Sequence, residues 1–410
     1  FPVNLQQGKV RIQNKYKFLA LDELLEARWE LTENGKVVQE GALPPLTIAP
    51  SSEQEYIIPF KKREYLPDSE YHLQIKFLLK ADQIWAKKGY ILAWVQFRVF
   101  STLLTSKSVL NEEGPELIIT DDNHKVQIGN SNFSLIIGRD SGAIEYFKYR
   151  NKKLITSELA PNFWRAPIDN DVGLFLFYPI LKKILRNFTF WKGASRKRKV
   201  IRFSIQHSSP NLAIVNVTFK IYKGKTKYES CITINGNGEI LVENSFSPKK
   251  DLIRFGMQTT VPSEFDDITW FGKGPHETYI DRETGAWTGI HHKTIEEFIH
   301  DYVHPQENAN RTNVRWFTLQ NEDGIGLRVE AMSGALLNFS VWPYTMEDLE
   351  TARHIHELPR RPFITMNIDY KQRGVGGDIP AVAQLHEEFK LKKNQIYHYS
   401  FKISPVLEGD

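Results

Sequence analysis

An alternation of apolar and polar residues with a period of two constrains the fold of this chain more than any other feature. It runs through YHLQIKFLL (71–79), GYILAWVQFRV (89–99), FSLIIG (133–138), AIVNVTFKIY (213–222) and GIGLRVEAM (324–332). Successive side chains of a strand point to opposite faces, so this period predicts strands with one buried face. A helical period is found mainly in 171–187 and 345–354. The sequence therefore predicts an all-β protein.

Short turn signals separate these strands, as in the segments ENGK (33–36), NGNG (235–238) and EDG (322–324). Close spacing of strands and turns is typical of packed antiparallel sheets. A polar segment with Gly and Pro, TSKSVLNEEGPE, interrupts the pattern after residue 104. We therefore expect a sandwich of immunoglobulin-like size over 1–104, a linker over 105–117 and a larger sandwich over 118–408.

Composition excludes several classes of protein. A hydrophobic content of 41% in 410 residues is that of a globular chain. The net charge of +4 selects no partner, and the basic run 196–199 is interpreted as a solvated loop, so no nucleic-acid partner is expected. One cysteine, Cys231, excludes an internal disulfide and a multi-cysteine zinc site. No apolar run of about eighteen residues is present, so we expect no membrane span.

The chain begins FPVNLQ, without Met and without a visible signal peptide. We interpret it as an excerpt or a processed product of a longer protein. The sequence does not give the compartment; we expect the cytoplasm, with the periplasm as the alternative.

Four polar segments break the strand pattern and are the candidates for chemistry. They are FWRAPIDNDVG (163–173), FGKGPHETYIDRETGAW (271–287), VHPQENANRTNVRW (303–316) and NIDYKQRGVGGD (367–378). The oxygen ligands of 169–171 resemble part of a calcium loop, but the other acidic positions are missing, so a capped turn is favoured and no metal is expected. The glycines of 374–377 lack the features of a nucleotide loop and favour a tight turn or a close backbone approach.

Two carboxylates, Glu277 and Glu307, lie in polar segments flanked by aromatic residues. Paired carboxylates are the requirement of glycoside hydrolysis. The favoured interpretation is nevertheless that each pairs with a nearby arginine, such as Arg282 or Arg311. The residues alone thus predict a two-domain β protein with a polar and aromatic surface suited to carbohydrate.

Taken together, the four segments resemble, in the same order, large β-galactosidases of the LacZ type in glycoside hydrolase family 2. QIWAKKGYILAWVQF (83–97) resembles the strand pair that ends the domain after their catalytic barrel. The resemblance covers about residues 1–408. It implies an immunoglobulin-like domain followed by a large β-supersandwich of the galactose-mutarotase type.

The same resemblance implies that the catalytic barrel is not in this chain. No catalytic residue and no cofactor is then expected here, while magnesium and sodium would be bound by the missing barrel. The implied function is the non-catalytic C-terminal portion of a retaining enzyme that hydrolyses terminal β-galactosides. The implied partners are a β-galactoside, the barrel itself and, in the intact enzyme, further copies of the chain.

Candidate substrate-binding residues also follow from the resemblance. The family places a tryptophan platform at the position of Thr365, which cannot stack, so Phe363 is the neighbouring alternative. Arg254–Met257 matches a mobile loop, with Gly256 as its hinge. Glu307, Asn308 and Arg311, with Gln306, are expected to organise the sandwich near the pocket, with direct sugar contact as the alternative. A stand-alone sugar epimerase, using His276, Glu277, His304 and Glu307, and a non-catalytic carbohydrate-binding module are the rival functions.

Overall fold

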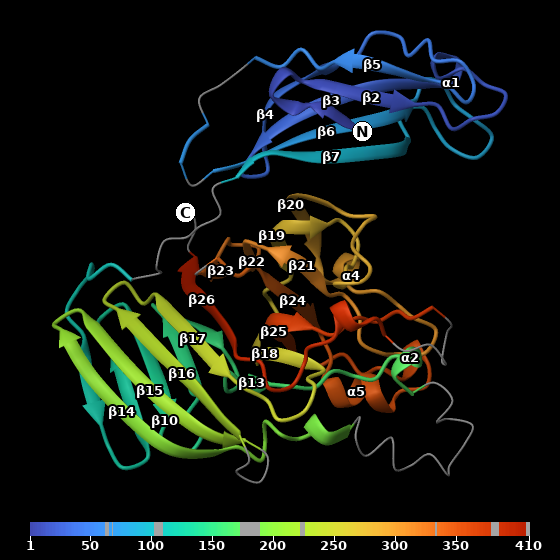
Figure 1. Cartoon of the computed structure of the whole chain (residues 1–410). Helices are drawn as coiled ribbons and strands as arrows, with labels where there is room; N and C mark the ends of the chain where they lie inside the picture. Colours follow the sequence, from blue (N-terminus) through green and yellow to red (C-terminus); the bar gives the residue numbers. More distant parts are fainter. Residues whose placement is uncertain are drawn as a thin grey trace. The chain divides into compact units, whose positions relative to one another are not determined.

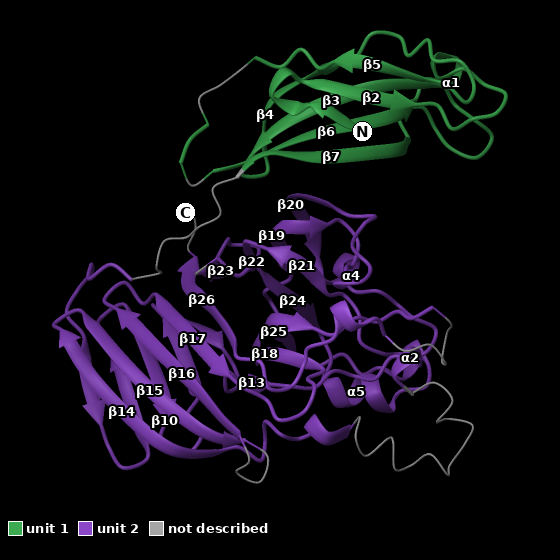
Figure 2. Ribbon diagram, viewed as in Figure 1, with its two compact units in different colours: residues 1–105 green, residues 106–410 purple. Residues whose placement is uncertain are grey.

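The computed structural model describes residues 1–61, 65–67, 69–101, 110–172, 189–221, 226–332, 334–378 and 385–406. The chain divides into two compact units, Phe1–Thr105 and Ser106–Asp410 (Figure 2). The sequence predicts a separate linker over 105–117. Part of this range lies outside the described residues. Each unit is built from antiparallel sheets, and the all-β prediction is confirmed.

The smaller unit is a sandwich of a three-stranded and a four-stranded sheet, ordered β1-β2-β5 and β4-β3-β6-β7. Its strands are β1 (Pro2–Asn4), β2 (Lys9–Gln13), β3 (Leu25–Glu33), β4 (Lys36–Ala42), β5 (Glu53–Ile57), β6 (Glu70–Leu79) and β7 (Ile91–Ser101), and one turn of helix, α1 (Leu21–Leu24), precedes β3. Val10 and Tyr56 from one sheet and Trp29 and Leu73 from the other share one apolar core. Alternation in the strands thus buries one face of each sheet against the other.

The larger unit contains sheets of five, five and nine strands (Figure 1). The first has the order β12-β11-β10-β9-β8. Its strands are β8 (Ile118–Asp121), β9 (Lys125–Gly129), β10 (Phe133–Gly138), β11 (Ile144–Tyr149) and β12 (Lys152–Ile155). It packs through residues such as Ile128, Leu135 and Phe147 into the main core of the unit.

The nine-stranded sheet has the order β14-β15-β16-β17-β26-β23-β22-β19-β20. Its strands are β14 (Lys199–Ser209), β15 (Leu212–Ile221), β16 (Thr226–Asn235), β17 (Ile240–Phe246), β19 (Asp267–Gly274), β20 (Trp287–Thr294), β22 (Trp316–Gln320), β23 (Gly326–Met332) and β26 (Tyr397–Val406). Phe219, Tyr228, Val242 and Phe401 project from one face into the main core.

The second five-stranded sheet, ordered β13-β18-β25-β24-β21, carries the polar segments. Its strands are β13 (Ala160–Asn162), β18 (Arg254–Pro262), β21 (Arg311–Val314), β24 (Leu337–Trp342) and β25 (Phe363–Gln372). β18 and β25 lie at its centre and pair over nine positions, from Arg254 with Gln372 to Pro262 with Phe363.

Helices are short. They include α2 (Asp169–Val172), α4 (Ile295–Phe298) and α5 (Met346–Thr351), with 3-10 turns at Leu5–Gln7, Thr189–Trp191, Ile355–Glu357 and Glu387–Phe389. The helix predicted over 345–354 is α5, capped by Thr345, whose side chain accepts a hydrogen bond from the Asp348 amide. Most of the helix predicted over 171–187 lies outside the described residues. Among the described helices, none has the length and apolar character that crossing a membrane requires.

Candidate functional site

The four polar segments of the sequence meet in space. Gln306 contacts Asp169, since its amide nitrogen donates to Oδ2 over 3.2 Å. The backbone amide of Ala309 donates to Oε2 of Glu277 over 2.7 Å. Arg165 donates to the carbonyl of Gly374 over 3.0 Å. Segments more than 200 residues apart thus form one polar network on and beside the sheet of β18 and β25.

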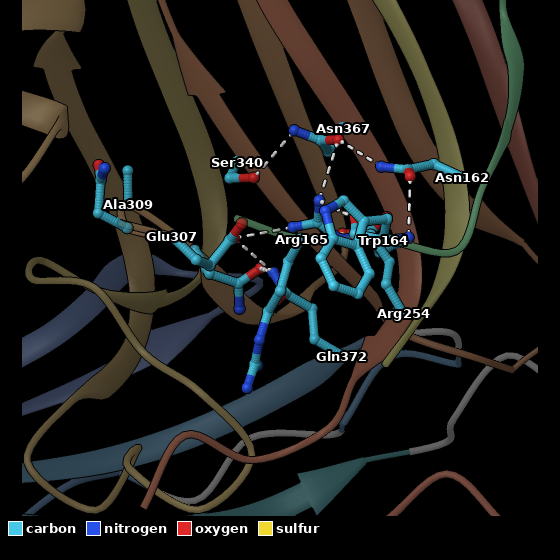
Figure 3. A network of polar contacts seen from close by, with 12 residues as sticks. Asn162, Trp164, Arg165, Arg254, Glu307, Ala309, Ser340, Asn367 and Gln372 are labelled. Atoms are coloured by element: carbon cyan, nitrogen blue, oxygen red, sulfur yellow. Dashed lines mark hydrogen bonds and ion pairs between the residues drawn. The ribbon is translucent and has the colours of Figure 1, made fainter. Parts of the chain in front are cut away.

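Arg254, at the start of β18, is the central cation of this network (Figure 3). Its Nη2 lies 2.8 Å from Oε1 of Glu307, and its Nε lies 3.1 Å from Oδ2 of Asp369. All three side chains are fully buried. The contact with Asp369 has the geometry of an ion pair without a hydrogen bond, because both carboxylate oxygens accept none from the described residues. One guanidinium therefore serves two buried carboxylates.

Burial shifts the pKa of both carboxylates upward. Burial raises the pKa of Asp369 to about 7, although Arg254 opposes the shift and nearby Glu307 adds to it. Burial also raises the pKa of Glu307, against Arg254 and the amide of Gln372, whose Nε2 donates to Oε1 over 2.8 Å. Since one arginine faces two acids, the charged form of the pair is costly in this buried site.

A chain of amides extends the network along β25. Asn367 accepts a hydrogen bond from Asn162 over 3.2 Å and another from Gln258 over 2.9 Å, and it donates to Ser340 over 3.2 Å (Figure 3). The same oxygen of Asn367 receives Nη1 of Arg254 over 3.3 Å. Four strands of the sheet are thereby joined by side chains as well as by the backbone ladder.

A second ion-pair cluster holds the segment 163–173 against the loop after β25. The guanidinium of Arg165 donates through Nε and Nη2 to the two oxygens of Asp171, at 3.1 Å each, and Arg373 contacts the same carboxylate. Burial would raise the pKa of Asp171, but the two arginines hold it below its ordinary value. Asp171 also accepts from the amide of Ile168 over 3.3 Å, so its side chain holds the start of α2. Its oxygens are thus occupied by arginine and backbone donors.

The loop that contains 374–377 is fixed by Asp281. Its Oδ2 accepts from the amides of Val375 and Gly376 over 2.8 and 2.7 Å. A Cβ on Gly374 would lie 2.4 Å from that oxygen, so the predicted close backbone approach is confirmed. Within the described residues, no group of three or more His, Cys, Asp or Glu is arranged to hold a metal ion.

Glu277 is held by three donors. Besides the Ala309 amide, it contacts Arg282 and the hydroxyl of Tyr302. The predicted pairing with Arg282 is confirmed. These residues border a depression of about 650 Å³, which His276 and Arg311 also line.

The predicted pairing of Glu307 with Arg311 is wrong, because Glu307 binds Arg254. Arg311 instead lies over the rings of Phe298 and Trp270, 4.0 and 5.1 Å from their centres. It donates to backbone carbonyl oxygens, such as that of Ala309 over 3.1 Å. Burial lowers the pKa of Arg311 to about 9. Its role in the structure is to tie loops together.

Asn308 is also internal. Its Nδ2 donates to the carbonyl of Gln306 over 3.0 Å, and its Oδ1 accepts from the amide of His300 over 3.4 Å. With Glu307 and Arg311 it is buried, and this placement favours the organising role over direct sugar contact. Sugar contact by these three residues stays untested.

Thr365 lies inside β25 and is 3% exposed. Its hydroxyl donates to the carbonyl of Tyr344 over 2.6 Å. Phe363, at the first position of β25, is half-buried and is the more accessible of the two candidates for a pocket wall.

The segment Arg254–Met257, expected to be a loop, is part of a strand. These residues begin β18, and Gly256 pairs with Asn162 on one side and Asp369 on the other. A Cβ on Gly256 would lie 1.8 Å from Oδ1 of Asp369. The glycine therefore makes room for a buried carboxylate and is not a hinge in this structure. The period of two that marks strands was the signal that could have shown this.

Sequence reasoning missed the partner of Glu307 and the amide chain through Asn162, Gln258 and Asn367. The amide chain depends on strand pairing between segments more than 100 residues apart, and Arg254 lies 53 residues before Glu307. The sequence signal for such a network is the polar residues, such as Arg254, Gln258 and Asn367, that alternate along the strands with core residues such as Phe255, Met257 and Ile368.

Each of the two units matches a family model built from known proteins. The family model described as the β-galactosidase small chain matches residues 129–403, and the model described as β-galactosidase domain 4 matches residues 10–100. A β-galactosidase of Priestia megaterium is 30% identical over 412 residues, which cover 98% of this chain and 38% of that protein. A β-galactosidase of Halalkalibacterium halodurans is 28% identical over 386 residues, which cover 92% of this chain and 36% of that protein. The chain thus spans less than two-fifths of the length of these relatives.

Solved structures show a weaker likeness. A galactose 1-epimerase from Lactobacillus acidophilus aligns with 70% of this chain and 97% of its own, with a TM-score of 0.40 and 8% identity. A galactose-mutarotase-related enzyme from the same organism covers 70% of this chain and 98% of its own, with a TM-score of 0.38 and 10% identity. Scores of this size carry no argument about function.

Proposed function

This chain belongs to the β-galactosidase small-chain family, the C-terminal portion of LacZ-type enzymes of glycoside hydrolase family 2, and we propose that it is the non-catalytic part of a retaining β-galactosidase. The intact enzyme hydrolyses terminal β-galactosides with a catalytic barrel that lies outside this chain. The chain supplies pocket-wall and inter-domain contacts, and the enzyme functions as a homo-oligomer. Magnesium and sodium are bound by the barrel.

The observation that carries this proposal is that the carboxylates of Glu277 and Glu307 are both bound by other groups of the chain. Retaining hydrolysis needs a free carboxylate nucleophile and a second carboxyl group beside the glycosidic bond. Glu307 is fully buried and held by Arg254 and Gln372. Glu277 is held by Arg282, Tyr302 and the Ala309 amide. Side chains bound in this way fix geometry and are poorly placed to attack an anomeric carbon.

The same network supports a positioning role. Asp281 fixes the loop after β25 through two backbone amides, and Asn170 donates to the carbonyl of Val375 over 2.8 Å. The loop is therefore held rigidly although Gly376 is exposed. Rigid polar loops at a surface suit a contact with another domain, and binding sites need such support around them. Phe363 is the wall residue of this proposal, with Thr365 behind it.

Hydrolysis of a chromogenic β-galactoside tests the proposal. The 410-residue chain is assayed alone, the catalytic portion is assayed alone, and the two are then mixed as separate polypeptides. We expect turnover only, or much more strongly, with both present. Turnover by the chain alone would overturn the non-catalytic assignment, and no effect of the chain on the catalytic portion would overturn the supporting role.

Two variants test whether Phe363 contributes to substrate binding rather than to stability. Phe363→Ala in the mixed assay is expected to raise KM for the galactoside with an unchanged unfolding midpoint. Glu322→Gln, in an exposed turn between β22 and β23, is the control and should change neither value. An unchanged KM for Phe363→Ala would remove this residue from the pocket.

A stand-alone sugar epimerase is the second candidate function. The observation in its favour is that His276 and Glu277, an acid–base combination, border the same depression of about 650 Å³. Polarimetry of freshly dissolved α-galactose with the chain tests it. Acceleration that is lost in His276→Gln would establish this function in place of the first.

A further inference from the structure

A polar groove lies on the face of the nine-stranded sheet that turns away from the main core, and its lining residues are different from those of the network around Arg254. Core residues such as Phe219, Tyr228 and Phe401 alternate with the residues that project to this outer face. The groove crosses β14, β15, β16, β17 and β26, which lie side by side in the sheet (Figure 1). It encloses about 600 Å³, which is within the usual range of small-ligand pockets.

Strand register places the groove side chains in two rows. One row joins Asn216, Cys231, Glu243 and Ser400 as successive cross-strand partners. The other joins Arg202, Thr218, Glu229, Ser245 and His398. Partners on one face of paired strands lie about 5 Å apart, so each row forms a continuous polar strip.

An apolar cluster lies on the same face of the sheet, beside the polar rows. Leu110, which precedes the first strand of the larger unit, forms an apolar cluster with Leu241 and Met332. Leu241 is two residues before Glu243 on β17 and therefore projects from the same face. Leu241 thus lies in the row of cross-strand partners next to that of Glu243.

The groove contains polar groups that the described part of the chain does not satisfy. Ser400 is 3% exposed, and its hydroxyl has no hydrogen-bond partner among the described residues. The structure shows no hydrogen bond or ion pair between described residues for the side chains of Glu229, Glu243 or Arg202. On the same sheet, by contrast, Glu239 and Glu330 each lie 3.0 Å from Lys402. Partial burial also raises the pKa of Glu243, as expected for a carboxylate without a cation.

The side chains that line the groove indicate which class of ligand it can bind. Among the described residues, no group of three or more His, Cys, Asp or Glu could hold a metal ion, so a cation site is not indicated. Two carboxylates disfavour an anion. Carboxylates need donors, Arg202 needs acceptors, and the amide of Asn216 needs both. A hydroxyl group both donates and accepts, so a ligand with several hydroxyls satisfies all of them.

We propose that this groove is a binding site for a neutral saccharide, separate from the site of the proposed galactosidase function. The aromatic residues beside it, such as Tyr399, point into the core, so recognition rests on hydrogen bonds and the affinity is low. Glu243 and Asn216 are its principal sugar contacts, with Ser400 at the floor. The site does not depend on the galactosidase proposal, because that proposal rests on other residues, such as Glu277, Glu307 and Phe363.

Cys231 provides a direct test, since it is the only cysteine of the chain and lies half-buried in the groove. The rate of its alkylation by iodoacetamide is measured with and without galactose, glucose or maltose. Burial and the neighbouring Glu243 raise the pKa of the thiol, so the assay is run at alkaline pH, with chain in denaturant as the control for reagent activity. We expect saturable protection. At a saccharide concentration about nine times Kd, the rate should fall about tenfold.

Variants locate the protection. Glu243→Gln and Asn216→Ala change exposed side chains and should leave the fold intact while weakening protection by the saccharide. Glu322→Gln, exposed in the turn after β22, is the matched control and should keep it. The ratio of rates with and without saccharide is compared within each variant, because Glu243 also affects the thiol directly.

Several results would overturn the proposal. These are unchanged alkylation at any soluble saccharide concentration, protection that survives both groove variants, and protection by spermidine or phosphate in place of saccharide. A thiol that reacts only in denaturant would show that another part of the protein covers the groove. Failure of the galactosidase assay alone would leave these measurements unaffected.

Discussion

Nε of Arg254 lies 3.1 Å from Oδ2 of Asp369, on adjacent central strands, and neither side chain is exposed. The same guanidinium binds Glu307 at 2.8 Å. Two acids and one cation thus share a buried space between β18, β25 and the loop before β21. Several measurable properties of the chain follow from this arrangement.

Removal of the cation is expected to be costly. In Arg254→Met, Glu307 and Asp369 lose their shared partner while remaining buried. Breaking a buried ion pair in this way costs about 3–5 kcal/mol of unfolding free energy. Urea denaturation measures it, with the triple variant Arg254→Met, Glu307→Gln, Asp369→Asn as the comparison. The triple variant should recover part of the loss, and equal stability of the two variants would contradict the shared-cation interpretation.

Stability should fall as the pH rises from about 4 to 7. Burial raises the pKa of Asp369 from its ordinary value of 3.8 to about 7 in the folded chain. Between these values the folded state binds a proton that the unfolded state has lost. The stabilising contribution is therefore full below the lower value and is lost as the pH passes the upper one. Its upper limit is about 4 kcal/mol, at 1.36 kcal/mol for each unit of pKa.

Asp369→Asn should flatten this dependence, because the amide does not titrate. The measurement is the unfolding free energy at several pH values between 4 and 8, in the chain and in this variant. An identical slope in both would show that Asp369 is not the titrating group.

Gly256→Ala should destabilise the chain through a clash with the same carboxylate. The added Cβ would lie 1.8 Å from Oδ1 of Asp369 and 2.8 Å from its Cα. Overpacking of this kind typically costs about 1–3 kcal/mol. Gly289→Ala, also within a strand, is the matched control, since its Cβ would meet no atom closer than 3.4 Å. Thermal unfolding of both variants is the measurement, and equal midpoints would refute the close approach.

The hydroxyl group of Thr365 should contribute to the stability of the chain through its hydrogen bond. Thr365→Val preserves the shape but leaves the carbonyl of Tyr344 without its donor at 2.6 Å. The expected loss is about 1 kcal/mol. Thr365→Trp should destabilise further because the site is closed, whereas Phe363→Trp at the half-buried strand start should be tolerated. Equal tolerance of tryptophan at both positions would mean that the pocket wall is open at Thr365.

Much of the architecture could be predicted from local sequence. Strands such as β6, β10, β15 and β23 lie where the period of two placed them. The turn at Asn235–Gly238 joins β16 and β17 as predicted. These features depend on neighbours in the sequence, so the alternation of side chains and the dihedral freedom of glycine are enough to indicate them.

The candidate site was predicted only in part. The polar segments were recognised as special, and Glu277 was paired correctly with Arg282. Glu307 was assigned to Arg311, four residues away, whereas its partner is 53 residues away on β18. The family resemblance predicts a loop at Arg254–Met257, whereas the alternation of polar and apolar residues there is that of the observed strand. Nearness in sequence is a poor guide where antiparallel strands bring distant segments into register.

The class of structure and the family follow from local periodicity and from the order of short motifs. Which charges meet depends on the tertiary fold. Arg254 has Glu307, Asp369 and Asn367 around it because β18 lies between β13 and β25, and no spacing along the chain encodes that pairing. The physical reason is that a buried charge is tolerated only with a partner, and the partner is set by sheet register.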